Sequence, residues 1–273
     1  QNGINNIAAI VFDVRRNEVL AYCGNVHFEK NISGNQVDII QSPRSTGSIL
    51  KPFLDCAMLQ EGELLPDQLL TDIPINMNGF APKNFSLQYD GAVHASEALA
   101  RSLNVPFVVS LRKYSLPKFY NVLKRAGMTT LSRSADNYGL SIILGGAEGK
   151  LWDISLMYLQ MTQQLNTYNN EGMYYAPVAP AYVLEENKEI PKEPIANPQF
   201  SAGAIWQTFT ALTNVNRPEE IDWRSIPSIQ KIAWKTGTSF GFRDGWAIGI
   251  NSGHVVGVWV GNSNGEGRPG LTG

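Results

Sequence analysis

The sequence predicts an α/β (α+β) fold in which an antiparallel sheet is flanked by helices and joined to a mostly helical lobe. Strand-like alternation of apolar residues occupies residues 1–45 and again residues 229–262. Helical spacing of apolar residues dominates residues 46–165. The 273 residues are 43% apolar, which is ample for one domain or for two closely packed lobes.

The first strands and the first helix follow from these periodicities. Residues 1–45 are expected to supply the first strands, with Arg15-Arg16-Asn17 as a hairpin turn. A helix that ends at Gln60 is predicted by apolar residues at helical spacing, which are Ile49, Phe53, Leu54, Ala57 and Met58. With Ser48 as its N-cap, Pro52 falls in the first turn, where a missing N–H costs nothing.

The middle of the chain predicts further helices and a surface excursion. A helix is expected over residues 96–110, with a break at Pro106. Residues 166–198 are rich in Asn, Tyr, Pro and Glu, and they predict an excursion with a short hairpin around residues 174–184.

The C-terminal part returns to the sheet. A helix is predicted at residues 199–216, with Ile205, Phe209 and Leu212 on one face. Three antiparallel strands are then predicted over residues 229–262, because apolar residues alternate between two turn segments at Gly241 and Asn251-Ser252-Gly253.

Three short patterns stand in one order along the chain. They are Ser48-Ile49-Leu50-Lys51, Ser102-Leu103-Asn104 and Lys235-Thr236-Gly237-Thr238. The Ser-x-x-Lys and Ser-x-Asn spacings recur elsewhere and are weak alone, whereas Lys-Thr-Gly occurs once. In this order, the set supplies the parts of a serine acyl-transfer site that needs no histidine.

The first pattern predicts a nucleophile beside its base. Residues three apart on a helix share a face, so the Nζ of Lys51 can reach the Oγ of Ser48. A free lysine is protonated at neutral pH, but burial and a second cation, Lys235, both lower a lysine pKa. We therefore expect Lys51 to be partly neutral. Taken alone, the pattern would more often be a capping serine followed by a solvated lysine.

The second pattern predicts a proton relay and a substrate contact. Ser102 is expected to lie between Lys51 and the leaving group. The side-chain amide of Asn104 can bond a substrate backbone in both directions. Without the third pattern, these residues would be read as an exposed helix end.

The third pattern lies on the first strand of the predicted three-strand unit. Gly237 lets another backbone approach closely, and a peptide substrate can pair along this edge as an added strand. Thr236 and Thr238 are expected to bind a carboxylate, with Lys235 behind them. The backbone N–H groups of Ser48 and Thr238 are the expected oxyanion hole.

Four segments together resemble the transpeptidase domain of class A penicillin-binding proteins, and most closely the 1C type. They are residues 44–53, 95–106, 144–148 and 235–262. The similarity extends from the hairpin at residues 8–23 to Gly261. It implies the fold shared by serine β-lactamases and D,D-transpeptidases.

The resemblance also implies a role for each motif residue. The implied catalytic residues are the acylated serine, its base and the relay, which are Ser48, Lys51 and Ser102. The implied substrate-binding residues are Asn104, Lys235, Thr236, Gly237 and Thr238. In this family the serine attacks the D-Ala-D-Ala bond of a stem peptide and releases D-alanine. An amine of a neighbouring peptide then resolves the acyl-enzyme and cross-links peptidoglycan.

The domain organisation and location are expectations from the same resemblance. Residues 1–273 are expected to form a single transpeptidase domain, with a sheet lobe at 1–45 and 199–273, a helical lobe at 46–165 and an excursion at 166–198. A glycosyltransferase domain and a membrane anchor are expected upstream in the natural protein, so the chain is expected to be a fragment. The expected location is the bacterial cell envelope, at the periplasmic face of the inner membrane.

Composition restricts the partners. The net charge of −2 indicates no nucleic acid, and no apolar run is long enough to cross a membrane. The histidines show no metal spacing, so no metal or cofactor is expected, and Cys23 and Cys56 are interpreted as buried free thiols. The expected partners are peptidoglycan stem peptides and β-lactam antibiotics, with other cell-wall synthesis proteins as candidates and membrane contact only through an anchor outside this chain.

Three alternative functions share the motifs. A serine β-lactamase needs a deacylating base, and Glu193 and Asn197 have the spacing of one such class, although they lie in a proline-rich stretch. A D,D-carboxypeptidase would use water in place of the acceptor amine. A non-catalytic penicillin-binding sensor ranks last, because all motif residues are present.

Overall fold

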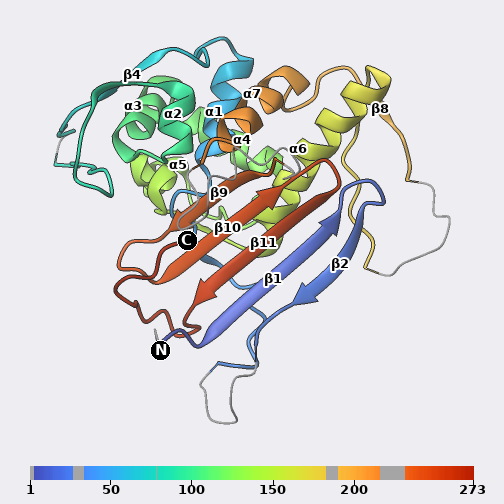
Figure 1. Cartoon of the computed structure of the whole chain (residues 1–273), viewed down its shortest axis with the longest axis horizontal. Helices are drawn as coiled ribbons and strands as arrows, with labels where there is room; N and C mark the ends of the chain where they lie inside the picture. The colour runs from blue at the N-terminus through green and yellow to red at the C-terminus, as the bar shows by residue number, and fades with distance from the viewer. Residues whose placement is uncertain (1–2, 27–33, 78, 183–189, 216–230) are drawn as a thin grey trace.

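Five strands from the two ends of the chain form one antiparallel sheet in the order β2-β1-β11-β10-β9 (Figure 1). The computed structural model describes residues 3–26, 34–77, 79–182, 190–215 and 231–273. The strands are β1 (Asn6–Asp13), β2 (Glu18–Cys23), β9 (Ala233–Thr238), β10 (Asp244–Ile250) and β11 (His254–Gly261). The predicted antiparallel sheet, its first hairpin and its last three strands are confirmed.

Alternation along the strands buries one face of this sheet. Ala8, Ile10 and Phe12 of β1 are fully buried, and the residues between them are half-buried. Trp246 of β10 lies directly opposite Trp259 of β11, and both indoles are within the core. This apolar face requires a covering layer, which the helices supply.

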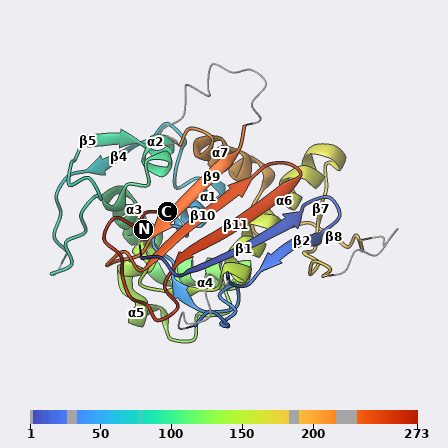
Figure 2. The ribbon, with the colours of Figure 1, turned by 60° about the horizontal axis from the view of Figure 1, so that its bottom comes forward.

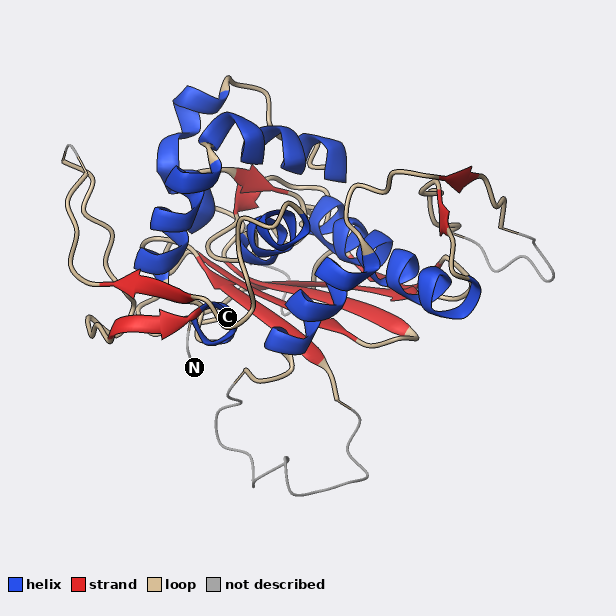
Figure 3. Cartoon of the chain, turned by 90° about the horizontal axis from the view of Figure 1, so that it is seen from above, coloured by secondary structure: helices blue, strands red, loops and turns tan. Residues whose placement is uncertain are grey.

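The helices lie together on one side of the sheet (Figure 3). They are α1 (Lys51–Gln60), α2 (Ala95–Ala100), α3 (Asn104–Tyr114), α4 (Leu116–Ala126), α5 (Ala135–Tyr138), the 3₁₀ helix η1 (Gly139–Leu144), α6 (Leu151–Glu171) and α7 (Ala202–Leu212). Helix α6 packs against β1, β10 and β11, and α7 packs against β9 and α1. A separate hairpin of β4 (Leu69–Asp72) and β5 (Gly91–His94) extends beside α2 (Figure 2).

The first helix begins later than the sequence predicted. Helix α1 starts at Lys51, and its N-cap, Leu50, has no side chain that can cap it. Ser48 instead lies in the turn before the helix, where its backbone O accepts from the N of Lys51 at 3.3 Å. Pro52 does lie in the first turn, as predicted. The capping role for Ser48 was therefore wrong, and its hydroxyl is not used by the helix.

The helix predicted over residues 96–110 is two helices, and the break is not at Pro106. Helix α2 ends in a Schellman motif, in which the N of Ser102 donates to Leu99 O and the N of Leu103 donates to Ala98 O. Helix α3 then begins at Asn104. Pro106 lies in the first turn of α3, where its missing N–H leaves no bond unmade.

The excursion also differs in detail. Helix α6 continues to Glu171, so the excursion begins after residue 166. Strand β7 (Tyr174–Tyr175) pairs with β8 (Pro194–Ile195) and not with a strand near residue 184. Residues 183–189 lie outside the described residues. The pairing closes a much wider loop than the predicted short hairpin.

Two further features concern the surface. Among the described helices, none combines the length and the hydropathy that a bilayer span requires. Cys56 is a buried free thiol as interpreted, but Cys23 is exposed because it lies at the end of the edge strand β2.

Candidate active site

The three motifs meet where residues 45–49, here called the nucleophile turn after the predicted nucleophile Ser48, touch the edge strand β9. The Nζ of Lys51 donates to the backbone O of Ser102 at 2.7 Å. The Nζ of Lys235 donates to the Oγ of Ser102 at 2.9 Å. Two lysines from different elements thus converge on the middle motif. The predicted proximity of the motifs is present in the structure.

Two glycines let the nucleophile turn lie directly on β9. A Cβ at Gly237 would stand 2.9 Å from the O of Thr46 and 3.1 Å from the N of Ile49. A Cβ at Gly47 would stand 2.6 Å from the O of Thr238, and Gly47 has a φ of +52°. The sequence predicted close approach of a backbone to Gly237. The approaching backbone in the structure is the turn that contains Ser48.

The other side of this turn rests on the segment that precedes α6. Strand β3 (Arg44–Ser45) pairs with β6 (Glu148–Gly149). The N and the Oγ1 of Thr46 both donate to the O of Ala147, at 3.2 and 3.0 Å. Sequence reasoning noticed this segment only as part of the resemblance. Its structural role is to hold the turn from the side opposite β9.

Two buried side chains hold the two ends of the nucleophile turn by hydrogen bonds to its backbone. The Nε1 of Trp246 donates to the O of Ser45 at 2.8 Å. The hydroxyl of Tyr158 on α6 donates to the O of Ile49 at 2.9 Å. The turn is thereby anchored to the sheet and to the longest helix. Ser48, half-buried, lies between these anchors.

Lys51 is fully buried, and its pKa is lowered well below the ordinary lysine value. Burial is the larger cause, and the nearby charge of Lys235 is the second. Both causes and the direction agree with the prediction. Within the described part of the chain, its Nζ donates to Ser102 O and to Asn104 Oδ1, both at 2.7 Å, and not to Ser48. A neutral amine has two hydrogens, so both are used here and its lone pair remains free to accept a proton.

Lys235 is a second buried amine. Its pKa is lowered to about 7 by burial. Besides the Oγ of Ser102, its Nζ bonds the backbone O of Thr236. Because the Ser102 hydroxyl can both accept and donate, it can take a hydrogen bond from Lys235 while passing its own proton elsewhere.

Ser102 has a backbone conformation that is unusual for serine. Its φ is +56°, the left-handed region that usually holds glycine at this position of a Schellman motif. This conformation ends α2 and directs the backbone O of Ser102 towards Lys51. Strained residues of this kind are frequent at functional sites.

Asn104 is engaged at both ends of its amide. Its Oδ1 accepts from Lys51 and its Nδ2 donates to the O of Lys83, at 2.7 and 2.8 Å. The sequence predicted that this amide would face a substrate in both directions. In the structure it faces the candidate base on one side and a loop of its own chain on the other.

Among the described strands, β10 is the only partner of β9 in the sheet, and the other edge of β9, called its free edge, carries the candidate oxyanion hole. Ser239 N donates to Asp244 O on β10. In an antiparallel pair, alternate amides face the partner, so the N–H groups of Thr236 and Thr238 face the free edge. The hydroxyl of Thr238 accepts from the N of Gly273 at 3.0 Å. The carboxylate-binding role of the two threonines stays a prediction.

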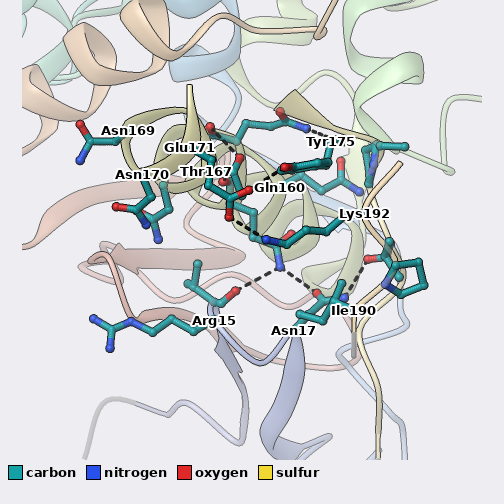
Figure 4. Close-up of a pocket in the computed structure, with 18 of the residues that line it drawn as sticks. Arg15, Asn17, Gln160, Thr167, Asn169, Asn170, Glu171, Tyr175, Ile190 and Lys192 are labelled. Atoms are coloured by element: carbon teal, nitrogen blue, oxygen red, sulfur yellow. Dashed lines mark hydrogen bonds and ion pairs between the residues drawn. The ribbon is translucent and has the colours of Figure 1, made fainter. Parts of the chain in front are cut away.

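A cavity lies away from the three motifs. It has a volume of about 480 Å³, and amide side chains line it together with Arg15, Tyr175 and Lys192 (Figure 4). Ser252 also lines it, which places it at the end of the sheet opposite Thr238. Glu193 adjoins this cavity in sequence, so the Glu-x-x-x-Asn spacing lies away from Ser48.

In the described part of the chain, no group of three or more His, Cys, Asp or Glu side chains is placed to hold a metal ion. The candidate site brings together the turn of Ser48, the hydroxyl of Ser102, the buried amines of Lys51 and Lys235, and backbone donors of β9. This is the composition of a serine acyl-transfer site.

The comparisons with known proteins agree with this class. The sequence model of the family described as "Penicillin binding protein transpeptidase domain" matches residues 7–264. The chain belongs to this family. Penicillin-binding protein 1C of Escherichia coli is 33% identical over 261 residues, which are 95% of this chain and 31% of that protein. Penicillin-binding protein 1A of Rickettsia prowazekii is 27% identical over 279 residues, which are 94% of this chain and 34% of that protein.

Solved structures show the same fold. The PonA1 protein of Mycobacterium tuberculosis in complex with penicillin V has a TM-score of 0.73 at 20% identity, over 98% of this chain and 72% of that chain. Penicillin-binding protein 1A of Haemophilus influenzae has a TM-score of 0.72 at 20% identity, over 98% of this chain and 45% of that chain. The chain spans about a third of the length of the curated relatives it matches.

Proposed function

We propose that this chain is a serine D,D-transpeptidase domain that cross-links peptidoglycan stem peptides and is acylated by β-lactams. The observation that carries the proposal is the convergence of Lys51 and Lys235 on Ser102 beside the turn of Ser48. Membership of the transpeptidase family supports the reaction class.

Acylation begins at Ser48. Its Oγ attacks the carbonyl carbon of the penultimate D-alanine, and its proton passes to the neutral Nζ of Lys51. The N–H groups of Ser48 and Thr238 stabilise the oxyanion. The C–N bond then breaks, and the proton held by Lys51 passes through the Oγ of Ser102 to the departing amine of the terminal D-alanine, so that Lys51 is neutral again. The hydrogen bond from Lys235 stabilises the Oγ of Ser102 when this oxygen has given up its proton.

The acyl-enzyme is then resolved by an amine. The amine of an acceptor stem peptide attacks the ester carbonyl and gives up a proton to Lys51. The ester C–O bond breaks, Ser48 recovers its proton, and a new amide cross-links the two peptides. With a β-lactam, the nitrogen released from the ring stays attached to the acyl group, so it remains near the ester after ring opening.

The donor peptide is expected to bind along β9. The free N–H groups of this edge suit an extended backbone that adds as a strand. Asn104, Lys235, Thr236, Gly237 and Thr238 are the proposed substrate-binding residues. Residues 1–273 are the proposed single transpeptidase domain. Its proposed location is the periplasmic face of the inner membrane, within a longer protein that carries an anchor and a glycosyltransferase domain.

The alternative of a serine β-lactamase is less well supported. That reaction needs a carboxylate placed over the acyl ester. The only sequence candidate was Glu193, and it lies beside the cavity at the opposite end of the sheet. A D,D-carboxypeptidase shares every residue of the acylation step and differs only in using water for the second step.

Intact mass after incubation with penicillin tests the proposal. We expect one covalent adduct on the wild type and none on Ser48→Ala. Ser110→Ala is the matched control, because Ser110 and Lys113 have the same spacing, but the Nζ of Lys113 donates to the O of Glu63. It should keep the adduct. An adduct that forms and clears within minutes would favour the β-lactamase, and the absence of any adduct on a folded wild type would overturn the proposal.

A further inference from the structure

An asparagine that sequence reasoning did not single out caps the helix of the second motif. Asn84 is 1% exposed, and its Oδ1 accepts from the N of Asn104 at 2.9 Å and from the N of Val105 at 3.2 Å. The natural cap position of α3 is Leu103, which has no capping oxygen. Asn84 supplies that oxygen from a loop twenty residues earlier.

A buried carboxylate sets the orientation of this amide. The Nδ2 of Asn84 donates to the Oδ1 of Asp72 at 2.7 Å and to the O of Gln88 at 3.0 Å. Asp72 is fully buried, and its other oxygen accepts from the N of Asp90 at 3.0 Å. A carboxylate accepts and a backbone N–H donates, so the amide fits only with its oxygen towards α3.

The loop that contains Asn84 makes a second contact with Asn104, through the backbone of Lys83. The O of Lys83 accepts from the Nδ2 of Asn104 at 2.8 Å. The amide of Asn104 is thereby held with its Oδ1 towards the Nζ of Lys51, at 2.7 Å. Neighbouring residues 83 and 84 therefore hold both the backbone and the side chain of Asn104. Through it they fix one of the two acceptors of the candidate base.

We propose that Asn84, oriented by Asp72, is a positioning residue for acylation of Ser48. The inference rests on the proposed function. When Asn104 is held in place, both hydrogens of neutral Lys51 have fixed acceptors and its lone pair has one direction. When Asn84 is lost, the first turn of α3 and the amide of Asn104 are free to shift, and Lys51 loses a fixed acceptor.

Stopped-flow acylation by a fluorescent penicillin measures this role. The readouts are the limiting acylation rate constant and the half-saturating concentration, taken per folded molecule and well below each melting temperature. Asn84→Ala is expected to lower the limiting rate constant roughly ten- to a hundredfold, the size of effect that a small misplacement of a catalytic group produces. The half-saturating concentration should stay near the wild-type value, because Asn84 does not line the edge of β9.

A reciprocal exchange separates positioning from general stability. Asp72→Asn alone removes the group that orients the amide, and it should also slow acylation. Combined with Asn84→Asp it restores the bonds to α3 and between the two side chains, because a carboxylate at position 84 accepts from α3 and an amide at position 72 donates to it, but the O of Gln88 loses its donor. We expect the double variant to recover part of the rate that Asp72→Asn loses. Asn76→Ala is the matched control, because Asn76 lies in the same connection between β4 and β5, where its Oδ1 accepts from the N of Gly79 in an exposed turn.

The outcomes are distinct. A wild-type limiting rate in folded Asn84→Ala overturns the inference, and so does a folded double variant that is as slow as Asp72→Asn. If Asn84→Ala does not fold, the Asp72→Asn and double variants decide the question, since both keep polar side chains at the two positions. If the wild type itself is not acylated, the proposed function fails first and the inference fails with it.

Discussion

At the scale of single residues, the orientation of Lys51 depends on the second motif. The acceptors of its Nζ are the backbone oxygen of Ser102 and the amide oxygen of Asn104. The direction of the backbone oxygen depends on the left-handed conformation of Ser102. The presence of a serine in the sequence does not predict this conformation.

That conformation leads to a prediction about Ser102. Ser102→Gly and Ser102→Ala both remove the relay hydroxyl, so we expect both to slow acylation to the same degree. They differ in backbone strain, because alanine has a Cβ that disfavours a positive φ and glycine has none. The glycine variant should be the more stable of the two by about 1 kcal/mol.

Urea denaturation and acylation kinetics on the two variants check this prediction. Equal stability of the alanine and glycine variants would show that the turn relaxes and that no strain is stored at Ser102. A glycine variant that acylates as fast as the wild type would remove the relay role and leave only the structural one.

At the scale of elements, the three-strand unit was predictable and the helix boundaries were not. Alternation over β9, β10 and β11 continues for twenty or more residues, and the turns between them carry Gly and Asn. The division between α2 and α3 has no Gly or Pro at the break, because Ser102 occupies the position that glycine usually takes. The capping of α3 by Asn84 is a tertiary contact, which local periodicity does not contain.

The contact between β9 and the nucleophile turn predicts a specific effect of Gly237→Ala. The added Cβ would meet the backbone of Thr46 and Ile49 at 2.9 and 3.1 Å, so the turn must shift. We expect acylation to slow by roughly tenfold or more and stability to fall by about 1–3 kcal/mol. Both values come from the same displacement of the turn that holds Ser48.

Gly249→Ala on the neighbouring strand β10 is the control. A Cβ there would meet only the Cγ2 of Ile232 at 3.7 Å, an ordinary contact. Fluorescent-penicillin acylation and thermal unfolding of both variants give the comparison. Equal rates for the two alanine variants would mean that the close approach at Gly237 does not position the nucleophile.

At the scale of the whole molecule, the sequence predicted the layers, and the structure shows what the layers enclose. The site lies where the helical layer meets one edge strand, so its amines are buried between the two. Burial lowers the pKa of Lys51 and of Lys235, which favours the neutral form of both amines in the folded state. Because the unfolded chain binds these protons more readily, the stability of the fold decreases as the pH falls. The cavity of about 480 Å³ lies at the opposite end of the sheet, away from the three motifs, so the presence of a cavity does not mark the candidate site.

A buried carboxyl group, that of Asp55, links two helices of the helical layer, α1 and α7. Asp55 lies on α1, one turn after Lys51, and its Oδ2 accepts from the Oγ1 of Thr208 on α7 at 2.8 Å. Burial raises the pKa of Asp55 to about 7, an effect that the bond from Thr208 partly offsets. The folded state therefore keeps a proton on Asp55 between pH 4 and 7, a range in which the unfolded chain releases it.

The sign of the resulting pH dependence follows from this difference. The contribution of Asp55 to stability is fully present below about pH 4 and is lost as the pH rises through about 7. Asp55→Asn carries no titrating group, so its stability relative to the wild type should rise with pH. The gain between pH 4 and pH 8 should reach up to about 4 kcal/mol, the free energy of a shift of about three pKa units. Urea unfolding at a series of pH values measures this gain. The control is Asp136→Asn at an exposed position, and its stability should follow that of the wild type at every pH.

A constant difference between Asp55→Asn and the wild type across this range would mean that Asp55 is ionised in the folded protein. The contact between α1 and α7 would then hold a buried charge, and the helix that carries Lys51 would place a negative charge one turn from the candidate base.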